Sequence, residues 1–211
     1  MPTLLRIDSS ARVAGSHTKR IADAAEAAWC NAHQDGVVVP RHIGTHPVPA
    51  LTQDAVSGFF TAAADRTLAQ RSAVKLSDIL IAEVREADTL LLTAPIYYFS
   101  VPGTLKCWID QVTRVGETFA FEGGDFRGLL REKRAVAICA YGGDGYLPGG
   151  AFAEANFLDP YLRFILKFIG IEDVRIVSVE ATGGPQVAER VDTAISYATA
   201  AMTAESWSDA A

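Results

Sequence analysis

Five short apolar runs alternate with stretches whose apolar residues recur at helical spacing, and this alternation limits the possible folds more than any other feature. The runs are rich in Val, Ile and Leu and cover Leu4–Ile7, Val37–Val39, Thr89–Thr93, Ala135–Cys139 and Val174–Val179. They do not alternate cleanly between apolar and polar residues, as expected of parallel strands that are covered on both faces. The pattern therefore predicts an α/β fold with a doubly wound, five-stranded parallel sheet.

Size and composition narrow the class of protein further. The 211 residues suit one domain that spans residues 1–211, and the hydrophobic content of 49% is enough for a sizeable core. The net charge of −6 argues against nucleic acid or an anionic membrane as a partner, because both favour a basic surface. The sequence shows neither a run of transmembrane length nor a secretory signal, so we expect a cytoplasmic protein.

Cysteine and histidine usage gives no sign of a metal site. The three cysteines, Cys30, Cys107 and Cys139, lack CxxC spacing, which argues against a disulfide framework and favours a reducing compartment. His42 and His46 are four residues apart, but they have no nearby Glu or Cys that would complete a set of ligands. We therefore expect no bound metal.

The segment between the first strand and the first helix is rich in hydroxyl side chains. It reads DSSARVAGSHT from Asp8 to Thr18. The free N–H groups at the start of a helix form an anion site together with the helix dipole, and Ser10, Ser16 and Thr18 can add hydroxyl donors. We therefore expect a phosphate monoester here, although Ser16 would also serve simply as an N-cap residue. The segment lacks both the GxxxxGK[ST] and the GxGxxG pattern.

Two further loops suit a flat aromatic ligand. Tyr97, Tyr98 and Phe99 follow the third apolar run, although aromatic residues of this kind also pack into cores. The fourth run ends in Ala140–Gly143, where glycines allow the backbone to approach a ligand closely. Ligands of open α/β sheets bind at the carboxyl ends of the strands. One anion loop and two ring-contacting loops describe a mononucleotide with a large planar head, for which FMN is the natural candidate.

The chain resembles the family of FMN-dependent NADH:quinone oxidoreductases and azoreductases, which has the flavodoxin-like fold. The resemblance covers about the first 180 residues and rests on the stretches DSS…GSHT, APIYYFSVPGTLKCWIDQV, GETFAFEGG, YGG and KFIGIEDV. Each stretch alone is a weak signal, and together they are a strong one. The resemblance implies non-covalent FMN as the cofactor and NADH or NADPH as the co-substrate.

The resemblance also assigns three groups of cofactor-binding residues. It places the FMN phosphate and its neighbourhood at Ser10, Ser16, His17 and Thr18. The isoalloxazine would lie against Ile96, Tyr97, Tyr98 and Phe99, and its pyrimidine side would be covered by Ala140, Tyr141, Gly142 and Gly143. Position 98 is commonly Asn and position 140 often Ser in this family. We expect FMN binding to survive Tyr98 and Ala140, whereas the resemblance leaves open what these two departures do to the redox potential and the substrate preference.

The implied activity needs no proton-transferring side chain, because the cofactor carries the redox chemistry. We expect two electrons to pass from NAD(P)H to quinones and azo compounds by a ping-pong mechanism, with hydride passing to N5 of the flavin. One alternative is a non-enzymatic electron carrier of the flavodoxin type. Another is hydrolysis at Ser16, whose neighbourhood formally matches SxxK without the SDN or KTG that would accompany it.

Phe121 and Phe168 are the expected residues of the substrate pocket. Phe119 and Phe121 flank a Gly-rich turn outside the regular strand–helix units, which is a poor place to bury two large rings in one domain. In the family that the chain resembles, the equivalents of Phe121 and Phe168 reach across a two-fold interface. We therefore expect a homodimer. Residues 125–134, DFRGLLREKR, are interpreted as a solvated turn and face.

Overall fold

The computed structural model describes residues 1–204, and residues 205–211 of the expected 1–211 domain lie outside the described part. Its main sheet has five parallel strands in the order β2-β1-β3-β6-β7. The strands are β1 (Thr3–Asp8), β2 (Val37–Arg41), β3 (Thr89–Pro95), β6 (Arg134–Ala140) and β7 (Asp173–Val179). Each expected run lies within one of these strands, so the predicted doubly wound, five-stranded parallel sheet is confirmed.

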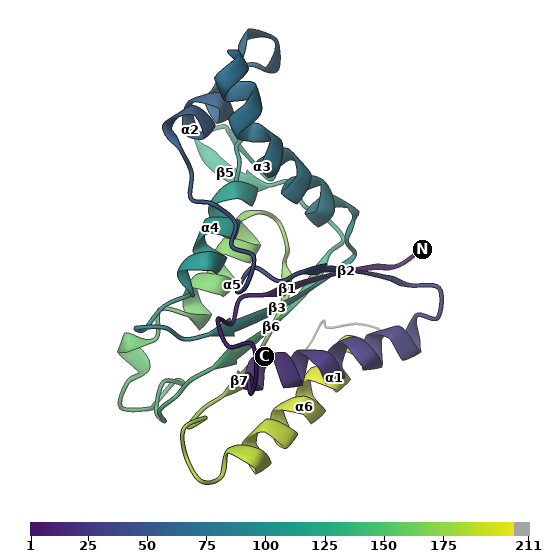
Figure 1. Ribbon diagram of the computed structural model, residues 1–211, viewed down its shortest axis with the longest axis vertical. Helices are drawn as coiled ribbons and strands as arrows, with labels where there is room; N and C mark the ends of the chain where they lie inside the picture. The colour runs from purple at the N-terminus through teal and green to yellow at the C-terminus, as the bar shows by residue number, and fades with distance from the viewer. Residues whose placement is uncertain (205–211) are drawn as a thin grey trace.

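Helices cover both faces of this sheet (Figure 1). The elements α1 (His17–Ala32) and α6 (Val187–Thr203) lie together on one face, where Ile21, Trp29 and Ala198 pack against strand residues such as Val136. The other face is covered by α3 (Leu68–Glu86), α4 (Gly103–Val112) and α5 (Asp159–Phe168), beside which lies α2 (Gln53–Phe60). Two buried apolar layers therefore hold the strands from both sides, and the loops at the strand ends are left for binding.

An antiparallel hairpin stands apart from the main sheet. It consists of β4 (Phe119–Glu122) and β5 (Asp125–Gly128), which pair with Phe121 opposite Phe126. The interpretation of residues 125–134 as a solvated turn and face is therefore wrong in part, because residues 125–128 form a strand and Leu130 is buried. The polar composition of this stretch is misleading, since Phe126 packs against the rings of Phe119 and Phe168.

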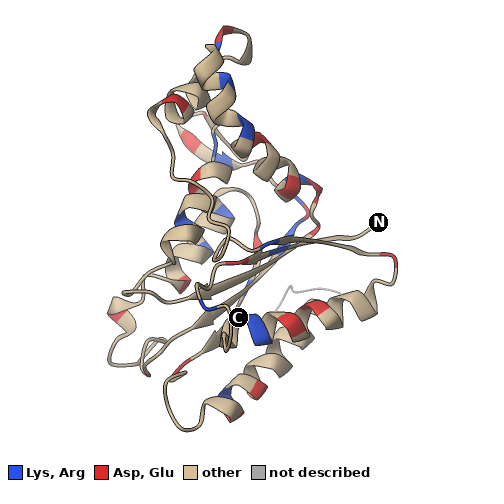
Figure 2. Ribbon diagram, viewed as in Figure 1, with Lys and Arg blue, Asp and Glu red and all other residues tan. Residues whose placement is uncertain are grey.

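The described structure also allows the distribution of charge, the hydropathy of the helices and the grouping of metal-ligating side chains to be examined. Lys, Arg, Asp and Glu are interspersed over the described elements and do not form a single basic face (Figure 2). Within residues 1–204 no helix combines the length and the apolar character that crossing a bilayer requires. The described part of the chain likewise holds no cluster of His, Cys, Asp or Glu arranged to bind a metal.

Gly170, which follows α5, provides a test of the packing between this helix and the hairpin. Its φ is +104°, and an added Cβ would lie 2.4 Å from the carbonyl oxygen of Leu130. Gly149 has a similar φ of +86°, but no described atom lies within 4 Å of its added Cβ. We expect Gly170→Ala to lower the free energy of unfolding by about 3–5 kcal/mol, and Gly149→Ala by only about 1–2 kcal/mol.

Urea unfolding of the two variants measures this difference. The shared cost is the left-handed backbone conformation, and the additional loss in Gly170→Ala is the clash with the Leu130 main chain. Equal losses in the two variants would contradict the close packing at Gly170.

Candidate functional site

Hydroxyl groups gather at the N-terminus of α1, as the sequence predicts. Ser16 is the N-cap residue, and its Oγ accepts a hydrogen bond from the Lys19 N–H at 3.4 Å. The same Oγ lies 3.0 Å from Ser10 Oγ and 3.2 Å from Thr18 Oγ1. The N-cap interpretation is thus confirmed, and it leaves the cluster of hydroxyls beside the helix N-terminus. This arrangement is chemically suited to a phosphate group.

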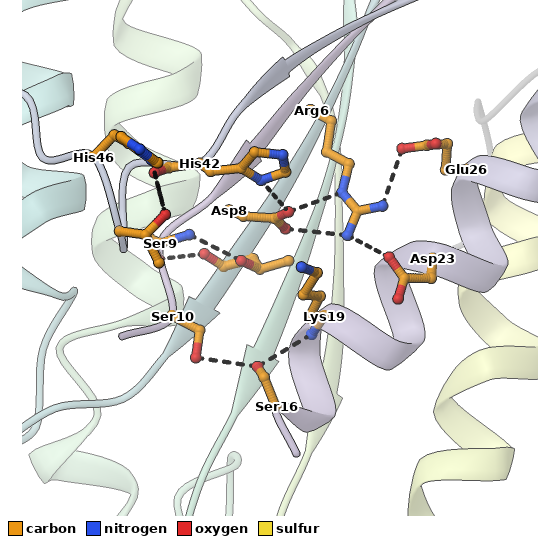
Figure 3. A network of polar contacts seen from close by, with 12 residues as sticks. Arg6, Asp8, Ser9, Ser10, Ser16, Lys19, Asp23, Glu26, His42 and His46 are labelled. Carbon is orange, nitrogen blue, oxygen red and sulfur yellow. Dashed lines mark hydrogen bonds and ion pairs between the residues drawn. The ribbon is translucent and has the colours of Figure 1, made fainter. Parts of the chain in front are cut away.

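A network of ion pairs centred on the buried Arg6 fixes the loop that carries these hydroxyls (Figure 3). The Arg6 side chain, only 6% exposed, contacts Asp8 Oδ2 through Nε at 3.1 Å. It also reaches Asp23 at 2.7 Å and Glu26 at 3.0 Å, both on α1. Burial alone would lower the pKa of the Arg6 guanidinium, but the three carboxylates raise it above its ordinary value. His42 Nδ1 adds a contact to Asp8 Oδ2 at 3.1 Å. The end of β1 is therefore locked to the first helix.

The same loop is tied to the neighbouring strand β3. The Ser9 N–H donates to Thr93 Oγ1 at 3.0 Å, and Ser9 Oγ donates to the Thr93 carbonyl oxygen. Both residues are buried. These bonds set the distance between the hydroxyl cluster and the loop that leaves β3.

The aromatic residues of the loop after β3 differ in whether they line a pocket. Tyr97 lines a pocket, and its hydroxyl accepts a hydrogen bond from the Ala11 N–H at 3.2 Å. Ile96 lines the same pocket and is held by its N–H, which donates to the Ala140 carbonyl oxygen at 2.8 Å. Tyr98 is 98% exposed, and Phe99 is half-exposed. Two of the four predicted ring-contacting residues, Ile96 and Tyr97, thus line the pocket.

The loop after β6 approaches the pocket mainly with its backbone. The Tyr141 side chain is fully buried, stacks on Tyr146 and accepts a hydrogen bond from Asn156 Nδ2 at 3.3 Å. Gly142 lines the pocket, and no described atom lies within 4 Å of a Cβ built on it, so its missing side chain leaves open space. The Tyr141 N–H and carbonyl oxygen are also bonded within the chain, to Val179 and Thr182, so this residue supports the pocket wall from behind.

A third loop, which follows β7, supports and extends this wall. The N–H groups of Ala181, Thr182 and Gly183 donate to the carbonyl oxygens of Gly143, Tyr141 and Gly142 at 2.7, 3.0 and 3.2 Å respectively. Thr182 and Gly183 also line the pocket. The sequence reasoning missed both residues, although the Thr-Gly-Gly stretch at the carboxyl end of the fifth strand was a usable signal.

These loops enclose a pocket of about 240 Å³ at the carboxyl ends of the strands. It brings together most of the predicted cofactor-binding residues, namely Ser10, Ser16, His17, Thr18, Ile96, Tyr97, Ala140 and Gly142. The residues that line it do not include the predicted Tyr98, Phe99, Tyr141 and Gly143. Arg12 lines the pocket beside the hydroxyls and was missed, because a lone Arg in a loop carries no pattern. One end of the pocket is suited to an anion and the other to a flat apolar group.

Phe121 and Phe168 lie in an aromatic cluster of the hairpin and α5. The ring centroids of Phe168 and Phe119 are 4.7 Å apart, and those of Phe121 and Phe126 are 5.0 Å apart. Phe121 remains 57% exposed. The described residues that line the 240 Å³ pocket do not include either Phe121 or Phe168. Within one chain these rings therefore form a separate apolar surface.

Comparisons with known proteins agree with this geometry. A family model described as flavodoxin-like fold matches residues 2–202. An FMN-dependent NADH:quinone oxidoreductase from Xanthobacter autotrophicus is 49% identical over 176 residues, which is 83% of this chain and 85% of that protein. An FMN-dependent NAD(P)H:quinone oxidoreductase 1 from Pseudomonas aeruginosa is 39% identical over 201 residues, 92% of this chain and 95% of that protein.

A solved structure shows the same fold at lower identity. The azoreductase from Bacillus anthracis str. Sterne superposes with a TM-score of 0.88 at 23% identity, covering 96% of this chain and 99% of that chain. The sequence relatives match over most of their own length, and the family model spans almost the whole described chain. The chain therefore belongs to the family of FMN-dependent NADH:quinone oxidoreductases with a flavodoxin-like fold.

Proposed function

We propose that this protein is an FMN-dependent oxidoreductase that passes two electrons from NAD(P)H to quinones and azo compounds. The observation that carries the proposal is the junction of the hydroxyl cluster at α1 with the loops after β3 and β6 in one pocket. The names of the relatives support the reaction, since they include FMN-dependent NADH:quinone oxidoreductase. A solved azoreductase of similar fold supports azo compounds as further acceptors.

The residues of the pocket fit FMN. Ser10, Ser16 and Thr18 would hold its phosphate together with the first N–H groups of α1. Arg12 would add a positive charge at the same end. The stacking surface would come from Ile96 and Tyr97, and the open space at Gly142 would admit the ring edge. A solved FMN-dependent NADH-azoreductase from Bacillus anthracis str. Ames Ancestor in complex with FMN, 20% identical to this chain, superposes with a TM-score of 0.86.

When bound, FMN supplies the two-electron redox chemistry. The chain's own part is to bind and orient: the hydroxyls hold the phosphate, and the Arg6 network keeps the loop in place. Donor and acceptor would bind in turn at the same part of the pocket, which is a ping-pong order. The alternative of a flavodoxin-type electron carrier differs by having no rapid reaction with NADH.

Anaerobic spectroscopy of the purified protein tests the reaction. We expect a flavin spectrum that NADH or NADPH bleaches and that a quinone then restores, because the two half-reactions are separate. Heat or acid should release FMN and no FAD, since the described chain has one anion loop and no second nucleotide fingerprint.

Three results would count against the proposal. Release of FAD would contradict the assigned cofactor. A flavin that NADH and NADPH leave oxidised would favour the electron carrier. Protein that takes up no flavin, combined with acylation of Ser16 by reactive esters, would favour the hydrolase.

Substitution of Ser16 tests the phosphate end. We expect Ser16→Ala to weaken FMN binding by about 1 kcal/mol, the contribution of one hydrogen bond. Ser16→Asp should weaken it about a hundredfold or more, because a carboxylate then faces the phosphate dianion. Fluorescence titration of the apoprotein measures both affinities.

The stability of the apoprotein supplies the control for this pair. Asp is a good N-cap residue and Ala is a poor one, so Ser16→Asp should be at least as stable as Ser16→Ala. The order of stability is therefore opposite to the order of FMN affinity. Equal FMN affinities for the two variants would argue against a phosphate at this helix.

We further propose a homodimer in which Phe121 and Phe168 wall the partner's substrate site. The exposed ring of Phe121 at the hairpin supports this proposal, because burying such a ring at an interface contributes about 2 kcal/mol. Isologous contacts of this kind would form two identical pockets.

Phe121→Ala tests this arrangement, with Tyr197→Ala as the matched control. Tyr197 is another exposed ring, and it lies on α6 at the opposite face of the sheet. We expect Phe121→Ala to raise the quinone KM and alter selectivity while FMN stays bound, and Tyr197→Ala to leave both kinetic quantities near wild type. A protein that sediments as a monomer and still reduces quinones at full rate would refute the shared pocket.

A further inference from the structure

The turn that follows β3 is strained at two successive residues. Tyr97 and Ser100 pair through both main-chain hydrogen bonds, at 3.1 and 3.3 Å, and so close a two-residue loop. Its central residues Tyr98 and Phe99 have φ values of +47° and +74°. Turns with positive φ at both central positions prefer Asn-Gly, because bulky side chains are unfavourable there. This chain has two aromatic residues in their place.

Neighbouring segments hold the turn in this conformation. The Phe157 N–H donates to the Phe99 carbonyl oxygen at 2.9 Å. Asn156 next to it donates to the Tyr146 carbonyl oxygen at 3.1 Å, and its Oδ1 accepts from the Leu158 N–H at 3.1 Å. The Tyr97 hydroxyl, bonded to the Ala11 N–H, holds the other side of the turn. Strain that the surroundings maintain in this way is characteristic of functional sites.

Of the rings on this turn, that of Tyr98 is by far the most exposed. Tyr98 is 98% exposed, so its ring has almost no cover from the described chain. It directly follows Ile96 and Tyr97, which line the pocket. Main-chain contacts with a ligand would be served equally well by Asn or Gly at position 98, and without strain. Main-chain contacts therefore do not explain a tyrosine at position 98, and the remaining explanation for the strained residue is a role of its ring.

We propose that Tyr98 is a specificity-determining residue whose ring stacks on flat acceptors, with a preference for fused-ring over single-ring quinones. This inference rests on the proposed function. A fused second ring offers additional apolar area and a larger π-surface to an aromatic side chain. An exposed tyrosine next to the pocket-lining Tyr97 supplies that surface, and its polar hydroxyl keeps it compatible with water.

Three substitutions of Tyr98 separate the ring from the strain. Tyr98→Phe keeps both the ring and the strain, Tyr98→Ala removes the ring and leaves an unfavourable φ, and Tyr98→Asn removes the ring and tolerates the φ. The measured quantity is the ratio of kcat/KM for 1,4-naphthoquinone to kcat/KM for 1,4-benzoquinone, with rates normalised to bound flavin. Thermal unfolding of each holoprotein and its sedimentation are recorded in parallel.

We expect Tyr98→Asn alone to combine a lower ratio of kcat/KM with a higher Tm than Tyr98→Ala. The ratio should fall about 2- to 10-fold in Tyr98→Ala and Tyr98→Asn, and it should persist in Tyr98→Phe. Tm should rise by about 2–6 °C in Tyr98→Asn relative to Tyr98→Ala. A purely structural tyrosine would move Tm without moving the ratio.

Other results overturn the inference. An unchanged ratio in Tyr98→Ala, in an enzyme that reduces both quinones, refutes the stacking role and leaves the proposed function intact. A ratio lost equally in Tyr98→Phe and Tyr98→Ala refutes the role of the ring. Dissociation of a dimer in Tyr98→Ala would show that a second copy covers the ring instead. A wild-type protein that reduces neither quinone removes the proposed function and this inference together.

Discussion

The guanidinium of Arg6 is the interaction on which the site depends. It lies beneath the first loop and joins Asp8, at the end of β1, to Asp23 and Glu26 on α1. A buried cation is tolerable because carboxylates surround it, and the removal of Arg6 would leave the buried Asp8 without the guanidinium that pairs with it. The geometry of the strand and helix is thereby fixed before any ligand arrives. The hydroxyl cluster at Ser16 inherits its position from this network, as does the opening of the pocket.

Hydrogen bonds that involve the main chain then connect each of these loops to the next. Ser9 bonds to Thr93, Ile96 to Ala140, and Tyr141 to Thr182, so that each strand end is tied to its neighbour across the sheet. Parallel strands bring their carboxyl ends to one edge, and these bonds convert that general property into a defined wall. A pocket wall of this kind needs few specialised side chains, because main-chain hydrogen bonds between the loops hold it in place.

The sequence allowed the sheet, the hydroxyl-rich start of α1 and the place of Gly142 at the carboxyl end of β6 to be predicted, because each depends on local patterns. Strand runs are continuous and apolar, and a helix that begins after Ser16 needs only its N-cap. The orientation of Tyr141 was beyond such patterns, since its ring is drawn inward by Tyr146 and Asn156, which come later in the chain. The strand formed by residues 125–128 was missed for the same reason, because the rings that recruit Phe126 include one on α5.

The edge of the sheet has a consequence for how molecules of this kind can associate. Strand β2 is an outer strand, and it contains Pro40, which pairs in register with Arg6 of β1. A proline has no N–H, so this strand cannot offer a continuous row of donors to another chain. Extension of the sheet from one molecule into the next is thereby discouraged at this edge. At this edge association is left to side-chain surfaces, where it can be selective.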